Sequence, residues 1–460
     1  MTDISKLETM LNDFDPAVRW QALKSLASAP LNPAVRRDDV NMHVHTFYSY
    51  NAEGWSPSRV AWEAHRQGLA AAGIIDFDVL DGMAEFFRAG EMLGLRTCVG
   101  VETRVYYTEY SSREIDSPGE PGVHYVGGAG FTRNFPEGTP QAEGLTSCRR
   151  AAQERNRALI ARINPWLPDI ALDYDAEVLP RSPGHCPTER HIVAAYVDKA
   201  ASKLPGDRLS AFWSGILGLP LPDLACLLVN RTAFEEKVRA RLAKRGGLGY
   251  EQPTARTFPL MEQFFAWVSS CDAVPMESWL DGCSEGEKEA GVLLEMSMAK
   301  GARALNIIPD RNWNIADPVQ RAVKVENLRR IVGLAHSMNL PVNIGTEMNR
   351  AGLPYVDELD GPVLREFKEV FLRGAMILAG HSTCAHFAGF PYAGVRAMSE
   401  FSGSTPKMNT FFAAAGSLPA VTEQTGDILR DLGPERAYGA ILDAVKTGQW
   451  SVDKKQRKKE

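Results

Sequence analysis

The spacing of apolar residues changes along the chain and separates regions of different predicted structure. Residues 3–28 carry apolar side chains at helical spacing, broken at Asp15-Pro16, which predicts two short amphipathic helices that cap the main domain. From about residue 38, short apolar runs typical of strands alternate with helical stretches. The order strand, helix, strand, helix, strand over residues 39–107 predicts a parallel sheet with crossover helices, so we expect functional side chains at the carboxyl ends of the strands.

Later segments continue this α/β pattern and interrupt it once. Helical spacing with proline breakers predominates over about residues 145–255 and predicts an α-rich insertion that covers one end of a barrel. Alternation then resumes and predicts a last strand at MILAGHS, residues 376–382. We therefore expect an N-terminal helical cap over 1–37, a barrel over 38–390, and C-terminal helices with a solvated basic tail over 391–460.

Composition and charge exclude few classes of function. The 460 residues carry a net charge of −6, so the surface as a whole lacks the positive field that attracts a nucleic-acid backbone. The seven cysteines are scattered and form no CxxC pair, which indicates reduced thiols. The N-terminus lacks the basic start and apolar core of a secretory signal, and no stretch approaches about 18 uninterrupted apolar residues. We expect a cytoplasmic protein without a membrane span; the sequence does not define an oligomeric state.

The strand-like run that opens the α/β region carries His43 and His45. Residues i and i+2 of a strand point to the same side, so the two imidazoles converge, as they must to hold one transition-metal ion. The two-residue motif alone leaves a structural reading equally open. Asp76 and Glu102 follow at the ends of the next two strand-like runs, where Asp76 could instead cap a helix and Glu102 could pair with Arg104.

Polar residues also end three later strand-like runs. These runs are apolar and then stop abruptly in charged or amide groups, which suits an active-site rim better than a core. We expect Arg311 and Glu347 to be catalytic there, and Arg311 or Arg104 to bind a phosphate or carboxylate, because a guanidinium donates two parallel hydrogen bonds. A small anionic molecule is the expected substrate. The residues at these three positions are Glu277, Asp310-Arg311-Asn312, and Glu347 with Asn349.

Four segments resemble motifs of the polymerase-and-histidinol-phosphatase (PHP) superfamily: IIDFDVLDG at 74–82, VGVETR at 99–104, VHYVGGAGF at 123–131 and ERHIVAAYVDKA at 189–200. The resemblance implies an α/β fold, a distorted TIM-like (β/α)7 barrel with the helical insertion and extra terminal helices. It also implies one to three divalent ions, Zn, Mn or Fe, with Glu102 as the bridging carboxylate and with Asp76 and Glu102 as catalytic residues. The candidate ligands that it implies are His43, His45, Asp76, Glu102, His124, His191 and His381.

The chain departs from the PHP pattern at two places. Phe77 stands where the second motif usually has a histidine, which removes one ligand. The closing Asp-x-His is absent in its usual form, and MILAGHSTCAHF offers His381 and His386 instead. Among the other histidines, His124 and His191 are also open to a structural reading, as hydrogen-bonded residues of the core or of a helix start.

Three functions are compatible with these residues. The first is hydrolysis of a phosphate ester, in a small phosphorylated metabolite or a nucleotide, by metal-activated water. The second is a single-metal barrel enzyme of another class, a C–N hydrolase, a lyase or an isomerase, which the loss of a ligand at Phe77 favours. The third is a lapsed PHP domain that binds a metabolite without turnover.

Overall fold

The computed structural model describes residues 3–30 and 35–451; the basic tail that the sequence predicts lies almost entirely outside this range. Its centre is one seven-stranded sheet with the strands in chain order. Neighbouring strands are parallel, except that β4 runs antiparallel to both β3 and β5. The strands are β1 Val40–Val44, β2 Ala71–Phe77, β3 Thr97–Tyr106, β4 Val123–Ala129, β5 Val274–Trp279, β6 Ala304–Ile307 and β7 Val342–Ile344.

The sheet curls into a nearly closed barrel because its last strand returns to its first. The residue after β7 that reaches β1 is Glu347, which bridges Val44 in parallel register. Its N–H donates to the carbonyl of His43 at 2.9 Å, and its carbonyl accepts the N–H of His45 at 2.9 Å. The predicted class, a distorted TIM-like α/β barrel of seven strands with additional helices, is therefore confirmed.

The crossover helices begin and end where their sequences provide caps. The helix between β1 and β2, α3, begins after Ser56, whose hydroxyl accepts the N–H of Arg59, and it ends at Gly68 in the left-handed conformation with φ 72°. The other helices around the barrel are α4 Met83–Leu93, α10 Met261–Ser270, α11 Glu285–Lys288, α12 Ala290–Lys300, α13 Asp310–Trp313, α14 Pro318–Ser337 and α15 Lys368–Ala388; α3 spans Pro57–Gln67.

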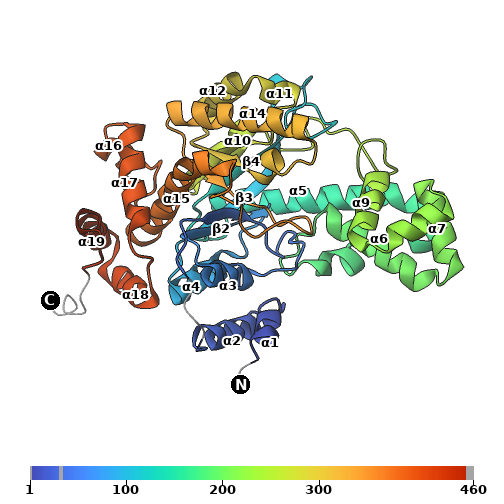
Figure 1. The fold of residues 1–460 in the computed structure, drawn as a ribbon, viewed down its shortest axis with the longest axis horizontal. Helices are drawn as coiled ribbons and strands as arrows, with labels where there is room; N and C mark the ends of the chain where they lie inside the picture. The colour runs from blue at the N-terminus through green and yellow to red at the C-terminus, as the bar shows by residue number, and fades with distance from the viewer. Residues whose placement is uncertain (1–2, 31–34, 452–460) are drawn as a thin grey trace.

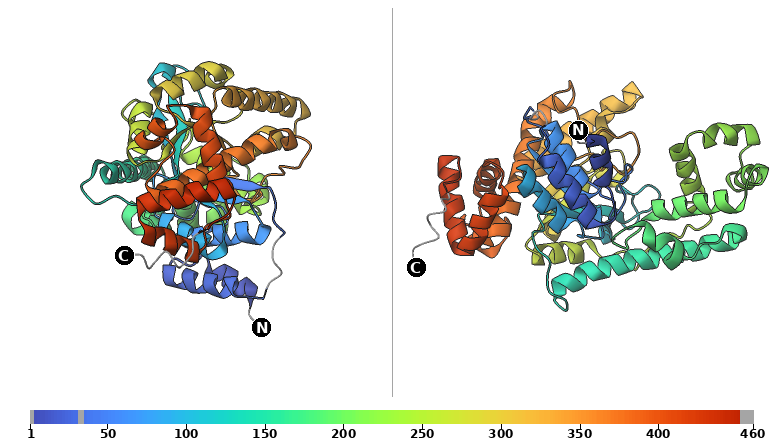
Figure 2. Two further views of the ribbon diagram at one scale, coloured as in Figure 1. Left: turned by 90° about the vertical axis from the view of Figure 1, so that its left-hand side faces the viewer. Right: turned by 90° about the horizontal axis from the view of Figure 1, so that it is seen from below.

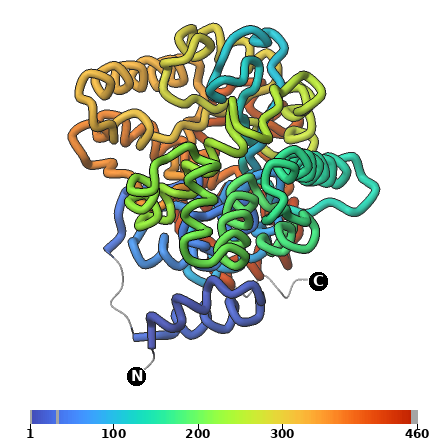
Figure 3. The backbone as a smooth tube through the Cα atoms, turned by 90° about the vertical axis from the view of Figure 1, so that its right-hand side faces the viewer, coloured from blue at the N-terminus to red at the C-terminus, as the bar shows by residue number. Residues whose placement is uncertain are grey.

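A helical insertion follows β4 and extends from one side of the barrel (Figures 1 and 3). It contains a buried apolar cluster of its own, built around Tyr196, Trp213 and Phe234, and this cluster is separate from the two that pack the barrel. The insertion is therefore held together largely by its own side chains. Its α-helices are α5 Pro140–Ile163, α6 Glu189–Lys203, α7 Asp207–Leu217, α8 Leu221–Leu228 and α9 Arg231–Leu242.

The terminal helices pack on other parts of the barrel. The N-terminal pair α1 Ile4–Met10 and α2 Pro16–Ala27 is attached through Arg19, which is 1% exposed and pairs with Glu85 of α4. The C-terminal helices lie at the end of the molecule opposite the insertion (Figure 2). They are α16 Val395–Glu400, α17 Thr405–Ser417, α18 Glu423–Leu432 and α19 Pro434–Thr447.

The predicted strand at residues 376–382 is wrong, because these residues lie inside α15. Short apolar runs are compatible with a buried strand and with a buried helix, and here the helix is apolar on most sides because it packs between the barrel and α17. Gly380 permits that contact: a Cβ added there would lie 1.9 Å from the carbonyl oxygen of Phe412. The tertiary contact thus decides between the two readings.

In the described part of the chain, no single helix is long and apolar enough to cross a membrane; α7 and α8 meet that criterion only as a pair bent by 105°.

Candidate metal centre

His43, His45 and Glu102 converge at the carboxyl-terminal side of the strands. His43 is the fourth residue of β1, and His45 is the first residue after that strand. Glu102 lies on β3, paired in register with Phe77 of β2. The Oε2 atom of Glu102 lies 3.6 Å from Nε2 of His43 and 3.3 Å from Nε2 of His45. Ligand atoms placed tetrahedrally around a zinc-sized ion are about 3.3 Å apart, so these separations suit one shared ion.

The three converging atoms have no hydrogen-bond partner although they are buried. His43 and His45 are 1% and 0% exposed, and Glu102 is 5% exposed. Their Nε2 and Oε2 atoms are among the buried polar atoms without a partner in the described chain. A buried polar atom without a partner costs free energy, so three at one point indicate a ligand that satisfies them together. The donor set of two imidazoles and a carboxylate fits a divalent transition metal.

The protein orients His43 through two asparagines. Nδ1 of His43 lies 3.0 Å from Oδ1 of Asn306, and that same oxygen accepts a hydrogen bond from Nδ2 of Asn343 at 2.9 Å. Because Asn343 donates to this oxygen, Asn306 presents an acceptor, and His43 carries its proton on Nδ1. The lone pair of Nε2 is then directed at the metal position, as is typical of ligating histidines.

A matching arrangement orients His45 through Asp76. Nδ1 of His45 lies 3.3 Å from the Ser49 hydroxyl, and that hydroxyl donates to Oδ1 of Asp76 at 2.5 Å. Asp76 also accepts the N–H and the hydroxyl of Thr46, both at 2.7 Å. Both carboxylate oxygens are therefore occupied by the loop after β1. The structure places Asp76, which the sequence predicts as a ligand, behind His45 as an orienting residue and outside the group of three converging ligand atoms.

Phe77, which stands where the sequence predicts a missing ligand, lies beside His45. Its ring stacks on the imidazole of His45 with centroids 4.5 Å apart and an angle of 18° between the planes. A side chain without donor atoms thus occupies the wall beside His45. This favours a single metal position over a multi-metal cluster.

Glu347 and Arg311 lie next to this group. Nη2 of Arg311 contacts Oε2 of Glu347 at 2.5 Å, and Asn349 donates to the same oxygen at 3.1 Å. Burial raises the pKa of Glu347, but the charge of Arg311 outweighs burial and lowers the pKa below its usual value. Glu347 has φ 59° at the seam of the barrel, a conformation that is uncommon for a non-glycine residue and that accumulates at functional sites.

Electrostatic coupling within the centre keeps Glu102 ionised. Burial raises the pKa of Glu102, but the close approach of His43 and His45 outweighs burial and holds the pKa below its usual range. Conversely, burial lowers the pKa of His43, and Glu102 more than reverses that effect. A bound cation would replace the proton on His43 as the positive partner of Glu102.

The structure does not bring His124 into the group. Its ring is fully buried on β4, with Nδ1 3.1 Å from Asp116 and Nε2 2.7 Å from Glu277. Successive residues of a strand point to opposite faces, so the His124 side chain lies on the face of β4 opposite to Tyr125, between two carboxylates. The backbone N–H of Tyr125 also bonds to Asp116. Glu277 is thereby a partner of His124, whereas the sequence predicts it on the active-site rim.

His191 and His381 also lie elsewhere in structural roles. In the first turn of α6, Nδ1 of His191 accepts the N–H of Thr188 at 3.0 Å and caps the helix. On α15, Nε2 of His381 donates to the Gly130 carbonyl at 2.9 Å, while Nδ1 accepts the N–H of Tyr392 at 2.9 Å. Burial lowers the pKa of each imidazole to about 4. Neither histidine, although predicted as a ligand, belongs to the group of three converging ligand atoms, and His386 likewise bonds to the carbonyl of Thr132.

Sequence reasoning missed the residues that orient the two histidines. Asn306 and Asn343 are buried amides inside short apolar strands, and Ser49 follows His45 by four residues in the loop. A buried asparagine in the middle of an apolar run requires a hydrogen-bond partner, and this signal is readable in the sequence. What it cannot give is the identity of the partner, 263 positions away in the case of His43 and Asn306.

Replacement of Asn306 by leucine is expected to weaken metal binding about 10- to 100-fold, because His43 loses the acceptor that fixes its tautomer and ring orientation. Titration calorimetry with Mn²⁺ or Zn²⁺ would measure the change. Asn306→Asp keeps an acceptor at the same position and is the matched control, expected to retain most of the affinity. Equal affinities for the leucine variant and the unmodified chain would contradict the orienting role.

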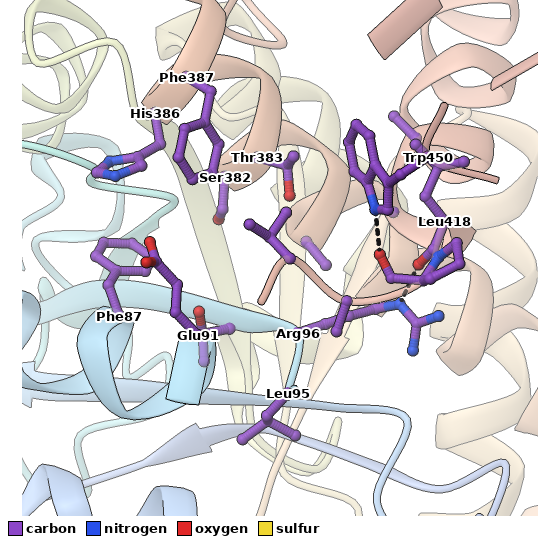
Figure 4. Close-up of a pocket in the computed structure, with 17 residues that line it drawn as sticks. Phe87, Glu91, Leu95, Arg96, Ser382, Thr383, His386, Phe387, Leu418 and Trp450 are labelled. Atoms are coloured by element: carbon purple, nitrogen blue, oxygen red, sulfur yellow. Dashed lines mark hydrogen bonds between the residues drawn. The ribbon is translucent and has the colours of Figure 1, made fainter. Parts of the chain in front are cut away.

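A cavity elsewhere in the molecule lacks comparable chemistry. It lies between α4, α15 and the segment after α17 (Figure 4). Its polar groups are already engaged: Arg96 donates to the Leu418 carbonyl at 2.9 Å, and the Trp450 indole N–H donates to the Pro419 carbonyl at 2.7 Å. None of the residues that line it belongs to the metal centre.

Comparison with known proteins adds no family name. No protein-family model matches the chain, and no curated protein matches it. An amidohydrolase from Chromobacterium violaceum, solved with bound sulfate and no metal, is 17% identical with a TM-score of 0.46 over 72% of this chain and 96% of that chain. A protein described as a metal-dependent phosphoesterase, from Bifidobacterium adolescentis, is 17% identical with a TM-score of 0.45 over 74% and 98% of the two chains.

The class of the protein is therefore defined by its own fold and site: a seven-stranded α/β barrel with one candidate metal centre among the described residues. Membership of the PHP superfamily remains a prediction from the motifs.

Proposed function

We propose that the chain is a metal-dependent hydrolase that binds one divalent ion at His43, His45 and Glu102. The observation that carries the proposal is the convergence of three buried ligand atoms without partners in the protein. Imidazole and carboxylate ligands fit Zn, Mn or Fe better than Mg. A divalent ion held there supplies Lewis acidity, which polarises a substrate oxygen and makes water nucleophilic at neutral pH.

The residues around the ion have separable roles in this proposal. Asn306 and the Ser49–Asp76 pair hold His43 and His45 with Nε2 toward the ion. Arg311 neutralises negative charge that develops on the substrate, and it keeps Glu347 ionised. Glu347 can then accept a proton from the attacking water, since its backbone bonds to that of His43 and His45 and its carboxylate is near enough for its charge to interact with theirs.

A phosphate ester is the substrate that we favour. Arg311 supports this choice, because a guanidinium matches the geometry and charge of a phosphoryl group. The second candidate is hydrolysis of a C–N bond, which needs only one ion, and Phe77 favours it by occupying the wall where a further ligand would be required. Both candidates use the same metal position, so substrate tests must separate them.

The purified full-length chain is expected to bind about one divalent ion, because the described residues assemble one group of ligands. Elemental analysis would give the stoichiometry, and the same preparation would be tested against phosphate monoesters, phosphate diesters and amides. Release of phosphate without release of amine supports the first candidate, and the reverse supports the second. Absence of bound metal after incubation with Zn²⁺ and Mn²⁺ would refute the proposal.

A further inference from the structure

Two arginines from distant parts of the chain meet beside the metal centre. Arg104 lies on β3 two residues after Glu102, and Arg155 lies on α5 of the insertion. Both guanidinium groups lie over the ring of Phe258, at 4.5 Å for Arg104 and 4.8 Å for Arg155. Arg155 of the insertion therefore lies next to Arg104 on β3, the strand that carries the candidate ligand Glu102.

Most hydrogen-bond donors of this pair are unused. Each guanidinium has five N–H donors. In the described chain, Arg104 makes one hydrogen bond, to Glu120 at 3.4 Å, and Arg155 makes one, to Asp78 at 3.4 Å. Both bonds are long, and both carboxylates have closer partners: Ser117 donates to Glu120 at 2.7 Å and Thr103 donates to Asp78 at 2.6 Å.

The two side chains are nevertheless largely withdrawn from water. Arg104 is 28% exposed and Arg155 is 22% exposed. Burial lowers the pKa of Arg155; the charge of Asp78 opposes this effect, and the neighbouring charge of Arg104 adds to it. By contrast, the buried Arg19 of α2 is fully engaged with Glu85 and two backbone carbonyls. Partly buried guanidinium groups with free donors are what an anion-binding position requires.

Two further cations lie on the same side, each already paired with a carboxylate. Arg239 and Lys244, from the end of the insertion, share the carboxylate of Glu189 at 2.5 and 3.0 Å. Lys244 also lies close enough to Arg104 for their charges to interact. Glu120 and Asp78 offset part of the repulsion between Arg104 and Arg155, and a dianion bound at the pair would offset it further.

We propose that Arg104 and Arg155 form a binding site for a phosphate dianion that belongs to the substrate but is not the group cleaved at the metal centre. The assignment of this phosphate to the substrate rests on the proposed function, whereas the binding of phosphate by the two arginines does not depend on it. Residues i and i+2 of a strand are about 6.5 Å apart and point to the same side, so Arg104 extends from the same face of β3 as Glu102. The preferred substrate is then a small molecule that carries a phosphate several atoms away from the bond that is hydrolysed.

Inorganic phosphate is the probe for this site. The metal-free full-length chain would be titrated with phosphate at pH 8, where the dianion predominates, by isothermal calorimetry. Arg155→Ala and Arg104→Ala are each expected to weaken phosphate binding at least about tenfold, because each removes a charge-assisted, two-point contact. Arg155→Lys keeps the charge but not the fork of donors, so its phosphate affinity is expected to fall less than that of Arg155→Ala.

The matched control is Arg157→Ala, on the same helix and two residues further on. Arg157 pairs with Asp175 and lies over the ring of Tyr174, away from Phe258. It is expected to bind phosphate as the unmodified chain does. Acetate, as a monovalent carboxylate, is titrated in parallel and is expected to bind at least about tenfold more weakly than phosphate.

Three results would overturn the proposal: equal phosphate affinity in Arg155→Ala and the unmodified chain, an equal loss in Arg157→Ala, or acetate binding as tight as phosphate binding. Mn²⁺ binding, measured on the same variants, is expected to be unchanged. If the chain binds phosphate at this pair but takes up no metal, the proposed hydrolase fails and the phosphate site stands. If it binds metal and hydrolyses esters but the variants bind phosphate normally, the phosphate site alone fails.

Discussion

Replacement of Glu102 by glutamine is expected to lower metal affinity by at least about 100-fold and to reduce hydrolysis to the background level. The substitution preserves the size of the side chain but removes the only negative charge among the three converging ligand atoms. A neutral amide oxygen is a poor ligand beside two imidazoles, and the buried ion would lose its counter-charge. Elemental analysis after dialysis and calorimetric titration with Zn²⁺ or Mn²⁺ would measure the effect.

Glu91→Gln is the matched control, because Glu91 is a salt-bridged glutamate of α4 that pairs with Arg430 far from the centre. It is expected to keep its metal and its activity. A Glu102→Gln chain that is folded and still holds a full equivalent of tightly bound metal would show that the ligands are other residues.

Replacement of His124 by alanine is expected to lower the free energy of unfolding at pH 6.5 by about 3–5 kcal/mol, because it leaves Asp116 and Glu277 as buried carboxylates without their shared partner. Urea unfolding would measure the loss. The folded fraction of the variant is expected to bind metal as the unmodified chain does, since the structure places His124 outside the metal centre. His124→Gln retains a hydrogen-bond donor without charge, so its free energy of unfolding is expected to fall less than that of His124→Ala.

This stabilisation also has a defined dependence on pH. Burial lowers the pKa of His124, but the charges of Asp116 and Glu277 outweigh burial and raise the pKa well above its usual value. A raised pKa in the folded state means that the contribution is fully present below the unfolded value of about 6.5 and is lost as the pH rises through the folded pKa. The difference between the two chains is thus expected to shrink at alkaline pH. A difference that grows with pH, or loss of metal from folded His124→Ala, would contradict the structural role.

The sequence was sufficient to predict the α/β class and to name the three residues of the candidate metal centre among its candidates. Alternating strand and helix patterns predicted the α/β class because side-chain periodicity is local. His43 and His45 share a strand face by the same local rule, and Glu102 follows because carboxyl ends of parallel strands meet at one rim. The one strand predicted wrongly, at residues 376–382, was a short apolar run whose state depends on the packing of α15 against α17.

Local pattern could not decide which polar residues share the site. His124, His191 and His381 occur in segments that resemble ligand motifs, but their ring nitrogens bond to carboxylates, a helix start and backbone groups. Asp76 was predicted as a ligand and lies behind one, because the loop after β1 folds over its carboxylate.

The sequence by itself thus determined the fold class and placed His43, His45 and Glu102 among seven candidate ligands; the structure brings these three together. Only the tertiary structure decided the rest: the asparagine pair behind His43, the seam that brings Glu347 to β1, and the meeting of Arg104 with Arg155. Each of these contacts joins residues that are distant in the chain. Such contacts depend on how the barrel closes and how the insertion folds back, and a local pattern carries no information about either.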